Sequence, residues 1–228
     1  MAKRGKKFIA AKAQVELGKK YEIAEAVTLA KAVSYAKFDG SLEVHVKTFA
    51  DPKYNDQMIR ATVVLPHGTG KKTIVAAFVS DDKIDLAKKA GADIAGNTEL
   101  IAQIEKGEIN FDVLVTTNDM MRDLAKVAKT LWPKGLMPSP KAGTVTTNLD
   151  QTIDEIKKGR VEFKLDKSGN IHVGVGKLSF TDQQLQENVQ ALMHAMLENK
   201  PSGVKGKLIQ KMVLAPTMGP SVQVNRQE

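Results

Sequence analysis

The sequence predicts an α/β protein of two domains, in which an α+β domain with an antiparallel-type sheet is interrupted by an inserted Rossmann-like parallel α/β domain. Near both ends of the chain, apolar and polar side chains alternate as they do in half-buried strands. Between residues 73 and 159, short apolar runs alternate with helical segments instead, which is typical of a parallel sheet with helical crossovers. We therefore expect residues 1–66 and 160–228 to form one discontinuous domain and residues 67–159 to form the inserted domain.

The first outer segment is expected to hold one helix and two strands. Residues 23–33 show the apolar spacing of an amphipathic helix. Residues 41–47 alternate strictly, and residues 59–65 form a second run that ends at Pro66. Just before the first strand, Lys37-Phe38 pairs a cation with an aromatic ring, a combination that can neutralise a phosphate and stack on a base. The alternative is that Phe38 belongs to the core.

The inserted segment is expected to alternate strand and helix throughout. Buried strands are expected at residues 74–79, 92–95 and 111–115. The helices between and after them are expected to be capped by Asp81, Thr98, Asn118 and Asp150, and the third to reach Leu131. Residues 132–145 contain three prolines and two glycines, so this stretch is expected to be a stiff loop.

The second outer segment returns to the alternating pattern. Residues 161–165 and 171–175 predict a hairpin with a five-residue loop between them. The segment continues with a helix whose capping box is formed by Thr181 and Gln184, and with two further strands at residues 208–215 and 222–224.

A short turn joins these last two strands. Pro216 and Pro220 stiffen its two ends, and Gly219 is expected to be the residue free to take positive φ. The turn is expected to expose Thr217 and Met218, and such groups suit contacts with phosphates, ribose hydroxyls or base edges. The alternative is an ordinary loop between two strands.

The charge of the chain is segregated. The 228 residues carry a net charge of +8, yet residues 67–159 hold 13 basic and 13 acidic side chains, so the whole excess lies in the outer segments. This favours a polyanion site built from both ends of the chain. Residues 3–7 form a basic stretch that either contacts phosphates or is a solvated tail. The chain has no cysteine and no apolar run long enough to span a bilayer, which fits a cytoplasmic protein.

The sequence offers little for catalysis. The loop at residues 68–72 resembles a phosphate-binding loop, but Leu65 stands where its first glycine belongs and Lys72 stands where serine or threonine belongs. Neither a glycine fingerprint nor metal-ligand spacing is found, so no cofactor and no metal are expected. An α/β enzyme that uses the Gly68–Lys72 loop is the alternative from another class, and a protein-binding scaffold is a third.

Five ordered blocks resemble the family of large-subunit ribosomal protein one in its bacterial form. The blocks are residues 37–39, 65–68, 134–138, 140–145 and 217–222. The resemblance implies a non-enzymatic, two-domain protein, monomeric off the ribosome, whose discontinuous domain binds large-subunit ribosomal RNA at the mobile side stalk. It also implies assistance in the release of exit-site tRNA, and repression of the protein's own operon through a messenger RNA site that mimics the ribosomal one.

The resemblance also carries over a set of RNA-binding residues. These are Lys37, Phe38, Ser41, Glu43, Lys164, Lys167, His172, Thr217, Met218, Gly219 and Ser221. Trp132 and Ser139 depart from the family pattern, which usually has glycine and asparagine there, so the resemblance leaves the role of the Lys134–Lys141 loop undefined.

Overall fold

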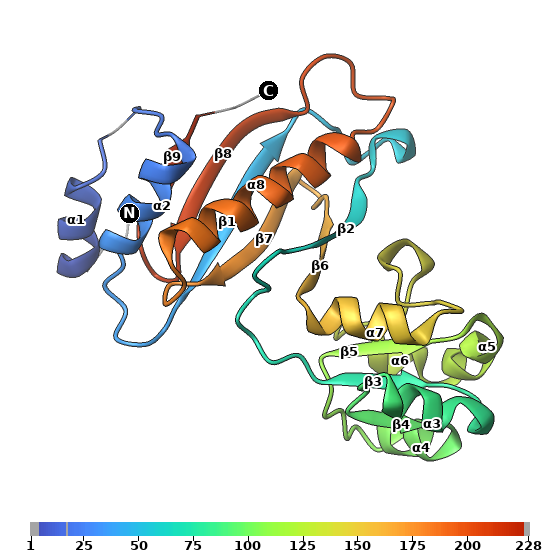
Figure 1. Cartoon of the computed structure of the whole chain (residues 1–228). Helices are drawn as coiled ribbons and strands as arrows, with labels where there is room; N and C mark the ends of the chain where they lie inside the picture. The colour runs from blue at the N-terminus through green and yellow to red at the C-terminus, as the bar shows by residue number, and fades with distance from the viewer. Residues whose placement is uncertain (1–4, 17, 226–228) are drawn as a thin grey trace. The chain divides into compact units, whose positions relative to one another are not determined.

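The chain folds into two compact units (Figure 1). The computed structural model describes residues 5–16 and 18–225. Unit 1 combines Met1–Gly70 with Val161–Glu228, and unit 2 is Lys71–Arg160. The sequence placed the two junctions after residues 66 and 159.

Unit 1 is built on a four-stranded antiparallel sheet with the order β7-β1-β8-β9. Its strands are β1 (Ser41–Thr48), β7 (Asn170–Lys177), β8 (Ile209–Pro216) and β9 (Val222–Val224). In β1 every second side chain, from Leu42 to Thr48, is buried, because one face of the sheet packs on the core. The other side chains of β1 point away from that core.

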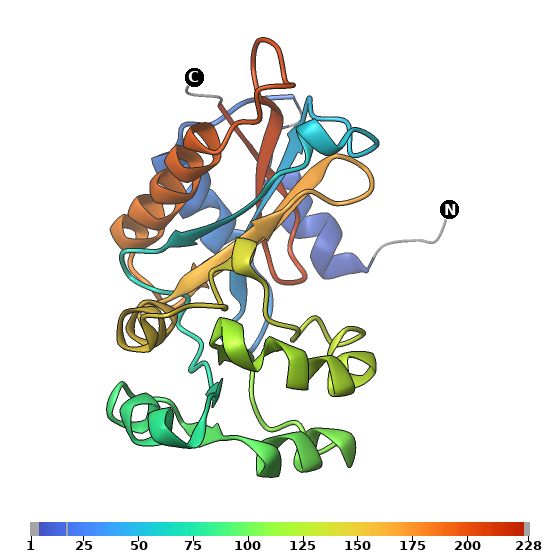
Figure 2. The same cartoon turned by 90° about the vertical axis from the view of Figure 1, so that its right-hand side faces the viewer.

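Two helices cover the buried face of this sheet. They are α2 (Ile23–Ala32) and α8 (Asp182–Glu198). The predicted capping box of α8 is confirmed, since the Thr181 hydroxyl accepts from the Gln184 amide at 3.3 Å and the Gln184 side chain accepts from the Thr181 amide at 3.0 Å. A third helix, α1 (Lys6–Ala13), was not expected from the sequence, and Figure 2 shows it on the opposite side of the sheet from α8.

The predicted hairpin after residue 160 is wrong in its pairing. β6 (Arg160–Lys164) pairs with β2 (Arg60–Val64) in a separate two-stranded sheet, whereas β7 pairs with β1. The two expected partners share a single bridge, between Leu165 and Ile171, next to the turn. Phe163 is fully buried in the core of unit 1, and this long-range burial overrides the local hairpin signal.

Unit 2 is a three-layered α/β unit. Its parallel sheet has the order β4-β3-β5 and consists of β3 (Val75–Phe78), β4 (Ile94–Gly96) and β5 (Val113–Thr116). Every residue of β3 is buried, because helices pack on both faces. One face is covered by α3 (Asp81–Lys89) and α7 (Leu149–Lys157). The other is covered by α4 (Thr98–Glu105), α5 (Met121–Leu124) and α6 (Ala128–Leu131). The predicted fold class is confirmed.

The expected helix from Asn118 to Leu131 is broken into four short pieces. These are η2 (Asn118–Met120), α5 (Met121–Leu124), η3 (Ala125–Val127) and α6 (Ala128–Leu131). Val127 has left the helical region, with φ −100° and ψ 6°. Its side chain is buried and β-branched, so packing decides its conformation over the modest helix preference of valine. Two further 3-10 turns are η1 (Asn55–Gln57) and η4 (Pro140–Ala142).

Three expected caps are displaced by one or two positions. The capping positions of α3, α4 and α7 are Ser80, Asn97 and Asn148, each outside the helix that follows. Acidic side chains still fall in the first turn of all three helices, where the positive end of the helix dipole stabilises them. In the described residues, no helix is long and apolar enough to cross a membrane.

Candidate nucleic-acid interface

The sheet of unit 1 presents polar side chains on the side away from α8. We call this surface the open face and define it by Ser41, Glu43, His45 and Lys47 of β1 and the residues opposite them. In the register of the sheet, Glu43 lies between Gly174 and Ala215, His45 between His172 and Val213, and Lys47 between Asn170 and Lys211. Both residues beside Glu43 therefore have small side chains.

Two histidines are hydrogen-bonded to each other at the centre of this face. The Nδ1 atoms of His45 and His172 lie 2.9 Å apart, so one ring donates and the other accepts. Nε2 of His45 lies 3.6 Å from Glu43, and Nε2 of His172 lies 3.4 Å from Asp166. Burial lowers the pKa of His45, Glu43 opposes this effect, and the charge of His172 adds to the lowering. The pair therefore favours a neutral His45.

This arrangement predicts a pH dependence of stability. Because the pKa of His45 is lower in the folded than in the unfolded chain, the unfolded chain binds more protons as the pH falls through about 6.5. Folding is therefore destabilised by acid at this position. Between about pH 7.5 and pH 5.5, the melting temperature of the wild type should fall further than that of His45→Gln, which keeps a polar side chain that does not titrate. Equal falls in both proteins would contradict the prediction.

At the Ser41 end of the open face, the turn after β8 is bound to β1. The Ser41 amide donates to the Thr217 hydroxyl at 2.9 Å, and the Thr217 hydroxyl lies 3.2 Å from the Ser41 carbonyl. The Thr217 amide also donates to that carbonyl at 3.0 Å. The sequence had suggested an exposed hydroxyl, but Thr217 uses it inside the protein, where it fixes the turn to the first strand.

The conformation of the turn differs from the expectation. Met218, not Gly219, has positive φ, at 65°. Gly219 is required for a different reason, because a Cβ there would lie 2.4 Å from Cγ of Pro216. A methionine in the left-handed region is strained, and its side chain is 62% exposed. Strain and exposure together are typical of a functional position.

Lys37 and Phe38 lie in the loop that enters β1 at the same end. Both are exposed, and Phe38 keeps 58% of its surface accessible, so the alternative of a core phenylalanine is wrong. The loop is fixed at Asp39, whose carboxylate accepts from the amide and the hydroxyl of Ser179 at 3.1 and 2.9 Å. Gly40 lies close to Thr217, since a Cβ there would be 3.2 Å from Cβ of Thr217.

The expected binding residues thus fall into two groups. The group at the Ser41 end, which we call the turn cluster, consists of Lys37, Phe38, Ser41, Thr217, Met218 and Gly219, with Ser221 leading into β9. The other group lies toward the opposite end of β1, with His172 on the open face, Lys167 in the turn before β7 and Lys164 at the end of β6 in the other sheet. Glu43 lies between the groups.

Two basic residues on the open face are not among the expected binding residues. Lys47 and Lys211 are directly opposite each other in β1 and β8, and both are exposed. Lys47 donates to the Ser168 carbonyl. Like charges in this position destabilise a sheet. The alternation of residues 41–47 predicts that Lys47 points outward, whereas the apolar run at residues 208–215 gives no such signal for Lys211.

The phosphate-loop alternative finds little support. Nζ of Lys71 donates to the Asp112 carboxylate at 2.9 Å, and this contact lowers the pKa of Asp112. The Gly68 carbonyl accepts from Asn188 at 3.0 Å. A phosphate loop instead directs its lysine and its backbone amides at the ligand. Among residues 5–16 and 18–225, no cluster of three or more histidine, cysteine or acidic side chains could hold a metal ion.

Comparison with known proteins identifies the class of this chain. It is 46% identical over 228 residues to the large ribosomal subunit protein uL1 of Kosmotoga olearia, covering 100% of this chain and 99% of the relative. It is 49% identical over 203 residues to uL1c of Phaeodactylum tricornutum, covering 89% and 88%. The relative from Thermosipho melanesiensis is 46% identical over 226 residues, covering 99% and 97%.

These full-length similarities define a structural protein of the large ribosomal subunit. The model of the ribosomal protein L1p/L10e family matches residues 30–220. The chain belongs to this family, and the resemblance stated from the sequence is confirmed.

Proposed function

We propose that unit 1 binds large-subunit ribosomal RNA through the turn cluster and the open face. The main observation that supports this proposal is the structure of the turn cluster. There an exposed aromatic ring, an exposed thioether and a lysine are held in place by contacts within the protein, from Asp39 to Ser179 and from Thr217 to Ser41. Groups that are ordered before binding lose little entropy on association. Aromatic rings and cations are the groups with which proteins stack on bases and neutralise phosphates.

The finer roles follow from the family resemblance and are part of the same proposal. The RNA site is the mobile side stalk, where the protein assists the release of exit-site tRNA. The protein also represses its own operon in the cytoplasm, where a messenger RNA site competes with the stalk for the same surface. It acts by binding and not by catalysis, and it is a monomer off the ribosome. The expected domain of residues 1–66 and 160–228 carries the RNA binding.

The salt dependence of binding tests where the RNA lies. If Lys37 and Lys167 contact phosphates, Lys37→Glu and Lys167→Glu should each weaken binding of a side-stalk transcript. The slope of log affinity against log salt should also become shallower by about 0.7 to 0.9 for each lost contact. Lys88→Glu, at an exposed position of unit 2, is the matched control and should leave the slope unchanged.

Equal effects at all three positions would place the interface elsewhere.

Repeating the titration with a transcript of the operon leader tests whether both RNAs bind the same surface. The same variants should lose affinity for both RNAs, and unlabelled stalk RNA should displace the messenger. A variant that loses only one of the two RNAs would contradict a common surface.

A further inference from the structure

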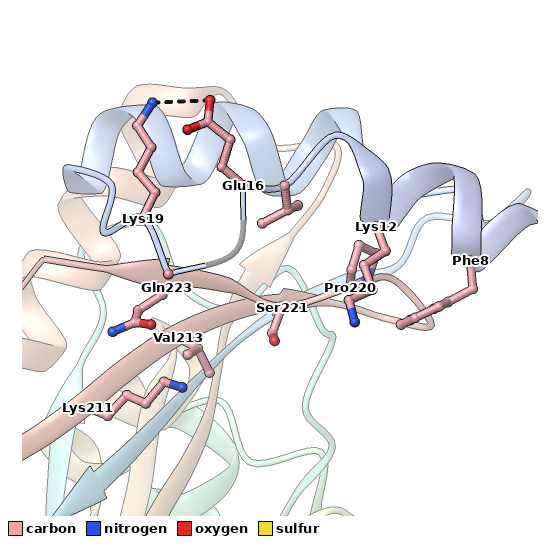
Figure 3. A pocket seen from close by; sticks show the side chains of 11 residues that line it. Phe8, Lys12, Glu16, Lys19, Lys211, Val213, Pro220, Ser221 and Gln223 are labelled. Carbon is pink, nitrogen blue, oxygen red and sulfur yellow. Dashed lines mark ion pairs between the residues drawn. The ribbon is translucent and has the colours of Figure 1, made fainter. Parts of the chain in front are cut away.

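A second site lies between α1 and the strands β8 and β9. Figure 3 shows a cleft with α1 and the segment that follows it on one side and the two strands on the other. Its volume is about 290 Å³. The strands contribute Lys211, Val213 and Gln223, with Ser221 just before β9. None of the expected binding residues except Ser221 lines it.

The cleft carries uncompensated positive charge. Lys12 extends from α1 toward the strands, and Lys211 lies on the strand side (Figure 3). Within the described part of the chain, neither forms an ion pair. Lys19 differs, since its Nζ lies 3.6 Å from Glu16 and 4.9 Å from the ring centre of Tyr21. Lys211 is additionally opposed by Lys47 across the sheet. An anion would relieve this repulsion.

The remaining lining suits a nucleoside. Ser221 is exposed and offers a hydroxyl, and the half-buried Gln223 offers an amide that can both donate and accept. Phe8, Val15 and Val213 add apolar surface. The volume of the cleft lies at the lower limit of small-molecule sites. It therefore accommodates one nucleotide and is too small for a double-helical segment of RNA.

We propose that this cleft holds a single nucleotide of the bound RNA, with its flanking backbone phosphates at Lys12 and Lys211 and its sugar or base at Gln223. The inference rests on the proposed RNA binding and extends it, because α1 becomes part of the interface. Ser221 belongs to both the turn cluster and the cleft.

The test measures affinity for a side-stalk transcript as a function of salt. Lys12→Gln and Lys211→Gln should each weaken binding about tenfold, as expected for a lost charged hydrogen bond. Each should also make the salt slope shallower by about 0.7 to 0.9. Gln223→Ala should weaken binding several-fold and leave the slope unchanged, because it removes no charge. Lys205→Gln, the same substitution at an exposed position outside the cleft, is the matched control.

The outcomes separate this inference from the proposed function. If the wild type does not bind the transcript with a salt-dependent affinity, the proposed function fails. Lys211 also belongs to the open face, so Lys12→Gln decides between the two surfaces. If the wild type binds, and Lys12→Gln binds as the wild type does, the cleft is not part of the interface. If the lysine variants lose affinity but Gln223→Ala does not, the lysines attract the RNA by charge alone, and the cleft does not hold a nucleotide. Free adenosine 5′-monophosphate should bind far more weakly than the transcript. If both ligands saturate the protein at similar concentrations, the cleft is a site for free nucleotides and not for RNA.

Discussion

Gly219→Val should destabilise the protein and weaken its binding to ribosomal RNA. A Cβ at position 219 would lie 2.4 Å from Cγ and 3.3 Å from Cδ of Pro216. Pro216 ends β8 opposite Leu42 and is buried, so its ring has little room to move. Overpacking of this kind costs about 1–3 kcal/mol. The turn must shift to accommodate it, and the contacts between Thr217 and Ser41 shift with it. Urea denaturation and RNA titration of the variant measure both losses.

Two companion variants separate crowding from backbone strain. Gly219→Ala should share most of the loss of stability, because the clash begins at the Cβ atom. Met218→Gly should change stability by less than about 1 kcal/mol, since relief of the strain at φ 65° offsets the added freedom of the unfolded chain. It should nevertheless bind RNA more weakly, because the exposed thioether is gone. If Gly219→Ala is as stable as the wild type, crowding against Pro216 is not the cause of the loss. If Met218→Gly binds RNA with full affinity, Met218 does not contact the RNA.

Much of the fold could be predicted because buried faces of helices and strands require apolar residues at regular spacing in the sequence. The strict alternation of residues 41–47 corresponds to β1, and the apolar stripe with its capping box corresponds to α8. Both signals are local. The α1 helix lacks such a signal, since Ala11 is its only buried residue among those described.

The candidate site was harder to predict because its contacts are long-range. Ser41 and Thr217 are separated by 176 positions, so nothing near Thr217 in the sequence shows that its hydroxyl is already used. The pairing of β2 with β6 and the approach of Lys12 to the same cleft as Lys211 have the same origin. Composition indicated a polyanion partner, but only the folded sheet shows which basic side chains share a surface.

Asn188 is a polar residue in an otherwise apolar stripe, which is a local signal for a buried hydrogen-bonded side chain. It occupies the apolar stripe of α8, three residues after Leu185, yet it is polar and fully buried. Its Oδ1 accepts from the His67 amide at 3.1 Å, and its Nδ2 donates to the carbonyls of Gly68 at 3.0 Å and Val175 at 2.7 Å. A side-chain amide in a core position is expected to form hydrogen bonds with other buried polar groups. Here the partners are the strand β7 and the segment that leaves unit 1 after β2.

Asn188→Leu should therefore destabilise the protein by about 2–5 kcal/mol, because several buried backbone groups lose their partners at once. Leucine has the same branched arrangement of heavy atoms as asparagine and is larger, so no empty cavity forms and crowding adds to the loss. Gln190→Leu, at an exposed position of the same helix, is the matched control and should be nearly neutral. Urea denaturation followed by circular dichroism gives both free energies of unfolding.

Hydrogen exchange distinguishes a local from a global effect of the same substitution. The His67 amide donates directly to Asn188, so in Asn188→Leu it should exchange faster by more than the loss of global stability explains. Amides at the centre of β1, such as that of Val44, should speed up only by the global amount. If His67 and Val44 change by the same factor, Asn188 stabilises the core as a whole and does not hold the segment at His67 and Gly68. If the free energy of unfolding is unchanged, the hydrogen bonds of Asn188 are replaced without cost, and its burial in α8 has no energetic role.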